Sequence, residues 1–350
     1  MLGGNAGRGG HRLALRTSEA VYSARELIAG AFGASPENVV FTLNCTHALN
    51  LAIQGIMSGG GHLIISGLEH NSSARPAAAL AASGKIKLSA AQVYPDDLRT
   101  AESFRRLIRS DTKAIVCTLA SNVTGQLLPI KAISELCRRH GICLIADGAQ
   151  ACGVIDVKLS DGIDILCTAG HKGLYGLSGT GLLITNGRFP IKPLMQGGTG
   201  NLSASLSQPT LLPEALESGT LNVPGIISLK AGTEFVLSKG ISAINAHETA
   251  LCDTFAGELS EVSRVKIYRE AGASYAPIVS FNITGIPPER AATALAEKGF
   301  CLRAGLHCAP LAHASNRTPG GTVRFSPSVF SRRPDVLRLT EEIKVLCSKQ

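Results

Sequence analysis

Short, continuously apolar runs alternate with segments of helical periodicity along the first two thirds of the chain. The runs at 39–43, 62–66, 114–119, 142–146, 163–167 and 182–185 have the length of strands. Runs without polar alternation are typical of strands buried on both faces of a parallel sheet. The segments 18–32, 133–140 and 226–238 carry apolar residues at helical spacing. The pattern predicts an α/β fold with a mostly parallel central sheet flanked by helices.

The pattern changes after residue 242. Segments 243–259 and 288–298 are predicted helices and 278–283 is a predicted strand, which indicates a smaller α/β domain over 243–350. The large domain is expected over 16–242. Residues 1–15, which begin with a glycine-rich stretch, are expected to form an arm.

Composition narrows the class of protein. No apolar run approaches the ~18 residues of a membrane helix, and the first residues contain no apolar leader segment. The ten cysteines show no paired spacing, which favours free thiols and a cytoplasmic setting. The net charge of +8 comes from scattered basic pairs, and aromatic residues amount to only 4%, so solvated helix faces and a few site arginines are favoured over nucleic-acid binding. No metal site is expected.

Two of the predicted strands end in residues with complementary chemistry. Asp147 follows the run 142–146, and Lys172 lies in a glycine-rich turn after the run 163–167. Ligands of open α/β sheets bind beyond the carboxyl ends of the strands. Pyridoxal phosphate needs a lysine that holds it as a Schiff base and an acid against its ring nitrogen. A lone lysine in such a turn is ordinarily just solvated, but the combination favours this cofactor.

The ends of other predicted strands carry polar residues, each of which could have either a structural or a functional role. Thr46, after 39–43, either caps the next helix or adds a hydroxyl to a phosphate site at the helix N-terminus. His70, after 62–66, is either a loop residue or a catalytic one. Asn122 and Gln150 are either turn amides or ligands of the crevice that Asp147 faces.

Several motifs resemble those of the class V, fold-type I pyridoxal-phosphate enzymes, in particular the cysteine desulfurase and selenocysteine lyase group. They are Asp-Gly-Ala-Gln at 147–150, Gly-His-Lys at 170–172, Glu-His at 69–70, Glu-x-Gly-Thr-x-Asn at 217–222 and Arg-x-Gly-x-x-Cys at 303–308. The resemblance runs over nearly the whole chain. It implies the fold-type I fold, pyridoxal phosphate as cofactor and a homodimer.

The resemblance also implies a role for individual residues. His70 would stack on the cofactor ring and transfer protons, Asn122 and Gln150 would bind its phenolic oxygen, and Arg324, with Asn122, would bind the substrate. Thr220 would reach the phosphate of the partner's cofactor across the dimer interface. The remaining cofactor contacts are expected from Asp147, Lys172, Cys45, Thr46, Thr168 and His171.

Cys308 differs from most of the other cysteines. Cys117, Cys137, Cys143 and Cys167 lie within apolar patterns and are predicted core residues. Cys308 follows a histidine in a loop that should be exposed, where it is either inert or a nucleophile that acts as a thiolate. The resemblance favours the nucleophile.

The predicted function is that of a cysteine desulfurase, which converts L-cysteine to L-alanine and passes the sulfur from a Cys308 persulfide to an acceptor, for example a protein. Alternatives are a selenocysteine lyase, a class V aminotransferase or lyase for another amino acid, and an inactive scaffold. Relatives carry a further N-terminal segment with a strand, which the chain is expected to lack. Ala169 stands where relatives have a threonine or serine against the phosphate, and His47 where many have a glutamate.

Overall fold

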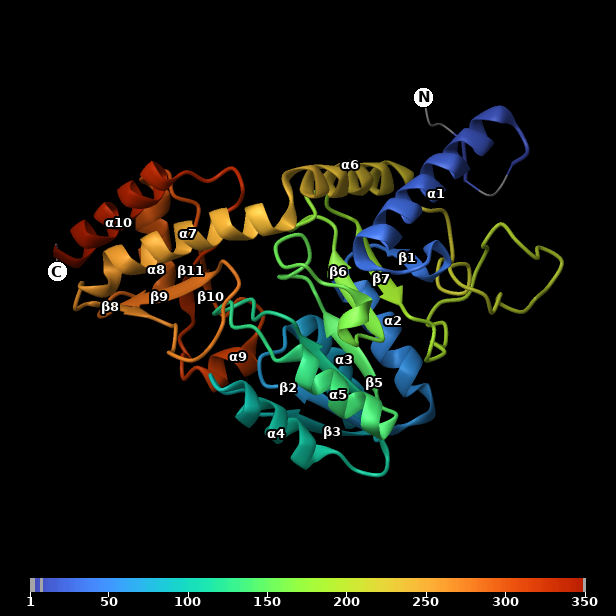
Figure 1. Cartoon of the computed structure of the whole chain (residues 1–350), viewed down its shortest axis with the longest axis horizontal. Coiled ribbons are helices and arrows are strands. Elements are labelled where there is room, and N and C mark those ends of the chain that lie inside the picture. The colour runs from blue at the N-terminus through green and yellow to red at the C-terminus, as the bar shows by residue number, and fades with distance from the viewer. Residues whose placement is uncertain (1–3, 7–8, 349–350) are drawn as a thin grey trace.

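The computed structural model describes residues 4–6 and 9–348. A seven-stranded sheet of order β1-β7-β6-β5-β4-β2-β3 forms the centre of the large domain (Figure 1). Its strands are β1 (Val39–Thr42), β2 (Gly61–Ser66), β3 (Ile86–Ala91), β4 (Thr112–Thr118), β5 (Cys143–Asp147), β6 (Ile165–Ala169) and β7 (Gly181–Thr185). Strands β3, β2, β4, β5 and β6 pair in parallel, and β7 pairs antiparallel with both β6 and β1. The predicted mostly parallel α/β sheet is confirmed.

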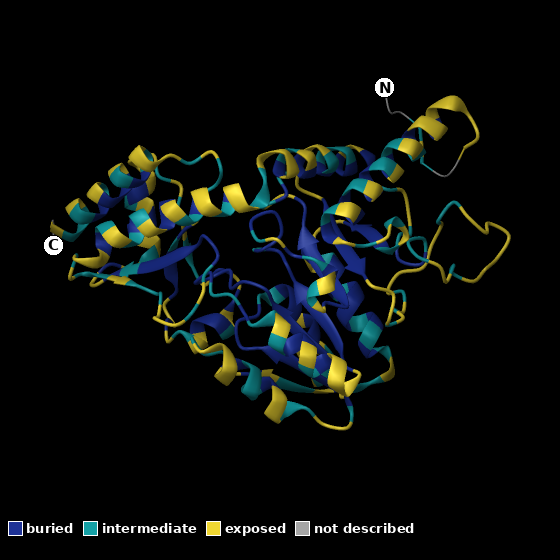
Figure 2. Ribbon diagram, viewed as in Figure 1, coloured by how far each residue is buried: buried dark blue, intermediate teal, exposed yellow. Residues whose placement is uncertain are grey.

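Helices cover both faces of this sheet. Side chains alternate between the faces along each strand, so Leu144 of β5 packs into one apolar cluster and Ile145 into the other. The first cluster includes side chains of α1 (Arg12–Phe32), α4 (Asp97–Leu107), α5 (Ile130–His140) and α6 (Val223–Lys239). The second includes those of α2 (Cys45–Ile56) and α3 (Asn71–Ala82). All strands of this sheet except β3 accordingly belong to the most deeply buried part of the chain (Figure 2).

Two elements differ from the sequence-based expectation. Strand β3 was not predicted, because it forms an edge of the sheet and only its first and last residues are buried, so it contains no continuous apolar run. Helix α1 begins at Arg12, inside the predicted arm, with His11 as its N-cap. Leu13 and Leu15 in its first turn are exposed, so the apolar periodicity begins only later. Residues 1–3 and 7–8 of the predicted arm lie outside the described residues.

A second, four-stranded antiparallel sheet of order β10-β11-β9-β8 forms the small domain. Its strands are β8 (Val265–Ile267), β9 (Val279–Ile283), β10 (Arg303–Gly305) and β11 (Thr322–Phe325). Side chains of α7 (Ile241–Ser260), α8 (Pro288–Ala296) and α10 (Arg333–Ser348) complete its core, in which Phe255 stacks on Phe325 with ring centroids 4.5 Å apart.

One segment of the predicted small domain packs on the large domain instead. Ala309 and Ala312, at the start and in the middle of α9 (Pro310–Ser315), belong to the apolar cluster of the large sheet. The link between β10 and β11 therefore returns to the strand ends of the large domain, and it carries Cys308 with it (Figure 1). Among the described residues, no helix has the length and hydropathy of a membrane span.

Candidate active site

Asp147 ends β5 and its side chain is almost completely buried. Its Oδ1 atom accepts hydrogen bonds from the Ala149 backbone amide at 2.9 Å and from the Cys45 thiol at 3.4 Å. Its Oδ2 atom has one long contact, with the Ser72 hydroxyl at 3.5 Å. The turn after β5 thus fixes the carboxylate through one oxygen and leaves the other with room for a further donor.

His70 lies at the N-terminus of α3, where it caps the helix. Its Nδ1 atom accepts from the Ser72 backbone amide at 3.0 Å, so in the neutral ring the proton is on Nε2. The Ser72 hydroxyl lies between two acceptors, 2.8 Å from the same Nδ1 atom and 3.5 Å from Oδ2 of Asp147, and it can donate its single proton to only one of them at a time. Burial lowers the pKa of His70, and the positive charge of Lys172 adds to this effect while Asp147 opposes it. The imidazole is therefore neutral at pH 7.

Lys172 lies in the turn that follows β6, and it is exposed. The turn is closed by hydrogen bonds from Tyr175 N to Lys172 O at 2.9 Å and from Gly176 N to Gly170 O at 2.8 Å. The ammonium lowers the pKa of His70 and opposes the large rise that burial and Asp147 cause in the pKa of Cys45. Asp147 and Lys172 consequently act on the same two side chains at one edge of the sheet.

Cys308 reaches this edge from the small domain. Its carbonyl oxygen accepts a hydrogen bond from the Asn71 backbone amide at 2.8 Å, directly beside His70. Its exposed thiol lies 3.7 Å from Nη2 of Arg303. His70 and Cys308 both line a cavity of about 540 Å³, together with Thr46, Asn50, Gln54, Asn71, Ser72, Arg75, Pro76, Ala79 and Leu80.

Arg324 lies on β11, opposite Arg303 of β10 in the sheet register. It donates from Nη1 to the Asn122 carbonyl at 2.7 Å, while its buried Nε has no hydrogen-bond partner. Burial, with the neighbouring Arg303 charge, lowers the pKa of Arg324 to about 10, so the guanidinium remains charged at neutral pH. Among the described residues, no carboxylate pairs with it. This cation is available to an anionic ligand.

The predicted phosphate-binding residues at the start of α2 have distinct environments. Asn44 is the N-cap, since its side chain accepts from the His47 amide at 2.9 Å. The interpretation of Thr46 as the helix cap is therefore wrong. Thr46 is instead exposed at the positive end of the helix. The Cys45 side chain, in contrast, is buried against Asp147.

Of the remaining candidate residues, Gln150 and His171 are accessible to a ligand, whereas Thr168 is buried. Gln150 is half-buried in the turn after β5, and His171 is exposed next to Lys172. Thr168 is buried, and its hydroxyl donates to the Gly148 carbonyl at 3.3 Å, within the sheet. The structure thus gives Thr168 an internal partner.

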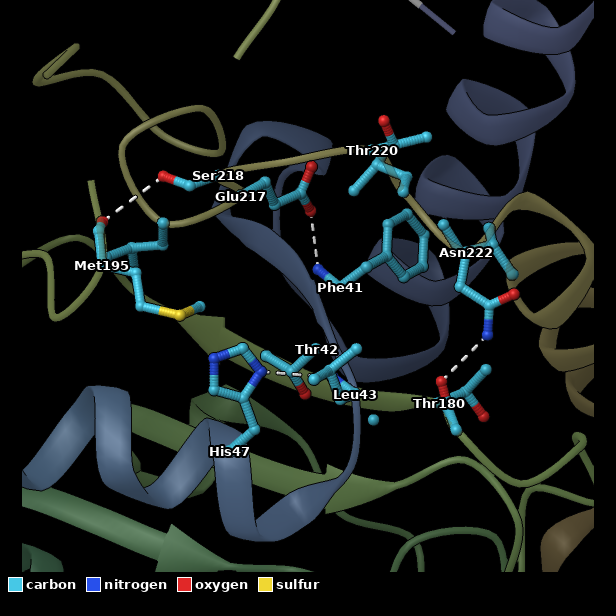
Figure 3. A pocket seen from close by; sticks show the side chains of 15 residues that line it. Phe41, Thr42, Leu43, His47, Thr180, Met195, Glu217, Ser218, Thr220 and Asn222 are labelled. Atoms are coloured by element: carbon cyan, nitrogen blue, oxygen red, sulfur yellow. Dashed lines mark hydrogen bonds between the residues drawn. The ribbon is translucent and has the colours of Figure 1, made fainter. Parts of the chain in front are cut away.

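Thr220 lies apart from the other candidates. It lines a smaller cavity of about 110 Å³ that also includes His47 and Glu217, and it does not line the cavity that contains Cys308 (Figure 3). The structure of the single chain therefore does not bring Thr220 together with His70 and Cys308.

Two supporting residues of the site received no role from the sequence: Ser72, described above, and Glu69, which was noted only as part of the Glu-His motif. Glu69 is fully buried and accepts hydrogen bonds from the Ser66 hydroxyl at 2.5 Å, the Ser73 hydroxyl, and the Thr118 backbone amide at 2.7 Å. Burial raises its pKa to about 7, and the hydrogen bonds oppose this shift. The available signal was a carboxylate with three serines within a few positions, immediately before His70.

Comparisons with known proteins define the family. The model of the class V aminotransferases matches residues 2–339, and the chain therefore belongs to this family. Within it, the chain is similar to the cysteine desulfurases. It is 30% identical over 349 residues to a probable cysteine desulfurase of Methanothermobacter thermautotrophicus, with 97% of this chain and 87% of the relative covered.

Solved structures agree with this placement. The structure of a cysteine desulfurase from Thermococcus onnurineus superposes with a TM-score of 0.92 at 28% identity, over 99% of this chain and 88% of the other. A cysteine desulfurase from Escherichia coli superposes with a TM-score of 0.87 at 24% identity, over 98% of this chain and 87% of the other, and shows the common fold.

Proposed function

We propose that the protein is a pyridoxal-phosphate-dependent cysteine desulfurase that forms L-alanine from L-cysteine and carries the sulfur as a persulfide on Cys308. The hydrogen bond between Asn71 and Cys308 carries the proposal, since it joins an exposed thiol to the edge where Asp147, Lys172 and His70 lie. The similarity to cysteine desulfurases over 97% of the chain supports the same activity.

The residues of this edge fit the cofactor. Oδ2 of Asp147 is buried with only one long contact, which suits a donor such as a pyridinium N–H. Lys172 would hold the aldehyde, His70 would cover the ring, and the positive end of α2 with Thr46 would bind the phosphate. Asn122 and Gln150 are the proposed partners of the phenolic oxygen. When bound, pyridoxal phosphate supplies an electron sink for the charge that develops at the substrate Cα.

The protein residues would then divide the remaining tasks. The Arg324 guanidinium binds the substrate carboxylate and fixes its orientation, because its planar fork matches two carboxylate oxygens. Nζ of Lys172 takes the Cα proton, and the neutral His70 donates a proton from Nε2.

The sulfur transfer itself is assigned to Cys308. Its thiolate attacks the substrate sulfur, and the electron pair of the Cβ–S bond stays on carbon and takes up a proton. One thiol and one L-cysteine thereby yield one persulfide and one L-alanine, and no external oxidant is needed. The persulfide then passes to an acceptor thiol, here proposed to belong to another protein.

The functional assembly is proposed to be a homodimer in the cytoplasm. Exposed leucines and a methionine lie on the loop that extends from the body between β7 and α6, namely Leu194, Met195, Leu202, Leu206 and Leu211 (Figures 1 and 2). Such a surface favours contact with a second copy. A role of Thr220 in the partner's site agrees with its absence from the Cys308 cavity. Ten free cysteines support a reducing compartment.

Incubation with L-cysteine tests the proposal. The protein loaded with pyridoxal phosphate is expected to release alanine and, with a reductant, an equal amount of sulfide. L-Selenocysteine in a parallel reaction distinguishes a selenocysteine lyase, and formation of an α-keto acid would indicate an aminotransferase. Absence of product from every substrate, with the cofactor bound, would favour an inactive scaffold and contradict the proposal.

A further inference from the structure

The loop that carries Cys308 has an unusual backbone. His307 and Cys308 are consecutive non-glycine residues with φ values of 49° and 56°. Both lie in the left-handed region, which L side chains adopt uncommonly. Such a conformation costs free energy and persists where surrounding contacts impose it, often at functional sites. The contacts that hold these two residues are therefore of interest.

The large domain holds the backbone carbonyls of the loop. The Nδ2 atom of Asn122 donates to the His307 carbonyl at 2.7 Å, and the Asn71 amide donates to the Cys308 carbonyl at 2.8 Å. Asn122 follows β4, and Asn71 begins α3. Both donors thus belong to the rigid edge of the parallel sheet.

The small domain holds the His307 ring. Nε2 of His307 lies 3.0 Å from the Thr322 carbonyl oxygen and 3.1 Å from the Thr322 hydroxyl. A carbonyl oxygen only accepts, so Nε2 carries the proton. The Thr322 hydroxyl donates to Ser280 Oγ at 3.1 Å, and Ser280 Oγ donates to the Val123 carbonyl at 2.6 Å. Since Val123 adjoins Asn122, the hydrogen bonds form a closed circuit through both domains.

The environment keeps the His307 ring neutral. The side chain is buried, and it stacks on His313 with ring centroids 5.7 Å apart. Burial, with the positive charges of Arg324 and Arg303 and the presence of His313, lowers the pKa of His307 to about 3. The ring is therefore uncharged throughout the neutral pH range, with its single N–H on Nε2.

We infer that His307 is a positioning residue, which fixes the backbone of the Cys308 loop in its left-handed conformation by joining it to β11 and so presents the thiol to the substrate. The inference rests on the proposed role of Cys308 as the sulfur acceptor. His307 is not a catalytic residue in this interpretation, since its ring nitrogens face Thr322 and the protein interior.

Substitutions of His307 in the cofactor-loaded enzyme test the inference. His307→Phe keeps a flat ring but removes the donor, and kcat is expected to fall about a hundredfold with little change in KM, as for a misplaced reacting group. His307→Gln offers an amide donor and should recover most of the rate. The control His62→Asn changes another buried histidine, bound to Thr112 and Ser89 in the sheet, and should leave kcat within about threefold of the wild type, as expected for a site remote from the chemistry.

Amide hydrogen exchange in the absence of substrate gives an independent readout. The Asn71 and Ala309 amides, which are hydrogen-bonded to Cys308 and Leu306, should exchange at least about tenfold faster in His307→Phe, and near the wild-type rate in His307→Gln. Unchanged exchange in the Phe variant would overturn the inference. Should that variant fail to fold, His307→Asn takes its place, because asparagine tolerates the left-handed backbone but does not reach Thr322. Wild-type exchange in His307→Asn would likewise overturn the inference.

The same measurements separate the two proposals. If the wild type forms no alanine from L-cysteine, the proposed function fails, whereas the exchange rates still decide whether His307 fixes the loop. If alanine forms and the exchange rates do not change, only the positioning role fails.

Discussion

The backbone amide of Asn71 donates a hydrogen bond to the carbonyl oxygen of Cys308 across 2.8 Å. This amide is one of the free N–H groups at the start of α3, which a helix cannot satisfy internally. The small domain supplies the missing acceptor, so the thiol is tied to the helix that His70 caps. The side chain proposed to cover the cofactor ring and the thiol proposed to attack the substrate sulfur are thereby kept in a fixed relation.

Replacement of Cys308 separates sulfur transfer from cofactor binding. Cys308→Ala should lose sulfide release from L-cysteine down to the uncatalysed rate, because no other thiol lines the cavity. Its near-visible absorbance with pyridoxal phosphate should remain, since Lys172 is intact, whereas Lys172→Ala should lose that absorbance. Cys301→Ala is the matched control, an exposed cysteine of the same segment, and should keep its activity. Sulfide release by Cys308→Ala at the wild-type rate would exclude the persulfide.

The acid limb of the pH–rate profile is expected to report on His70. Its pKa is lowered from 6.5, so the ring stays neutral down to a pH below that value. Protonation of Nδ1 would then break the hydrogen bond from the Ser72 amide and remove the cap of α3. We expect kcat/KM to be flat near neutrality and to fall only at a pH below 6.5.

His70→Ala should lower kcat by about 10²–10⁴-fold and abolish this limb. A limb that persists unchanged in the variant would assign the titration to another group.

Most of the fold follows from the chain's apolar runs, because strands buried on both faces need continuous hydrophobicity. The edge strand β3 lacks that signal, since Lys87 and Ala90 face solvent. The start of α1 lacks it too, because exposed leucines obscure the helical spacing. The structure thus differs from the sequence-based expectation at β3 and at the start of α1, two segments whose residues are only partly buried.

Part of the candidate site was predictable because parallel strands end at one edge. Asp147 and His70 meet there for that reason alone. The contacts of Ser72 and Glu69 depend on side-chain directions around the start of α3 and at the ends of β2 and β4, which a sequence pattern does not specify. The place of Thr220 depends on a second chain in the proposed dimer, and no local pattern in one chain contains that information.

Glu69 should make stability depend on pH. Its pKa is about 7 in the folded chain and 4.5 ordinarily, so the folded state binds the proton more tightly. The free energy of unfolding should therefore fall as pH rises from about 4.5 to about 7, by about 3 kcal/mol for this group, and stay level above that range.

Denaturant unfolding at about pH 5 and about pH 8, measured for wild type and Glu69→Gln, isolates the contribution of this group. The variant should lack the extra loss of stability at the higher pH. Glu297→Gln, at an exposed position on the small domain, serves as the control and should follow the wild type. Parallel pH dependence in wild type and Glu69→Gln would show that the carboxyl is ionised throughout.

A buried ion pair is expected to anchor the segment that precedes Thr220. Arg25 donates two parallel hydrogen bonds to Glu217, each 2.8 Å long. The Phe41 amide donates a third to the same carboxylate at 2.6 Å, and this hydrogen bond is drawn in Figure 3. The two side chains are 7% and 6% exposed, so removal of one partner leaves the other charge buried and uncompensated. Arg25→Met should lower the free energy of unfolding by about 3–5 kcal/mol in urea titrations.

The exposed pair of Lys87 and Asp111 provides the comparison, and Lys87→Met should change stability by less than about 1 kcal/mol. The double variant Arg25→Met/Glu217→Leu removes both buried charges and should recover at least half of the loss, because no uncompensated charge remains. In Arg25→Met, but not in Lys87→Met, the affinity for pyridoxal phosphate should also decrease if Thr220 acts in the partner's site. A loss in Arg25→Met no larger than in Lys87→Met would mean that solvent already reaches this pair.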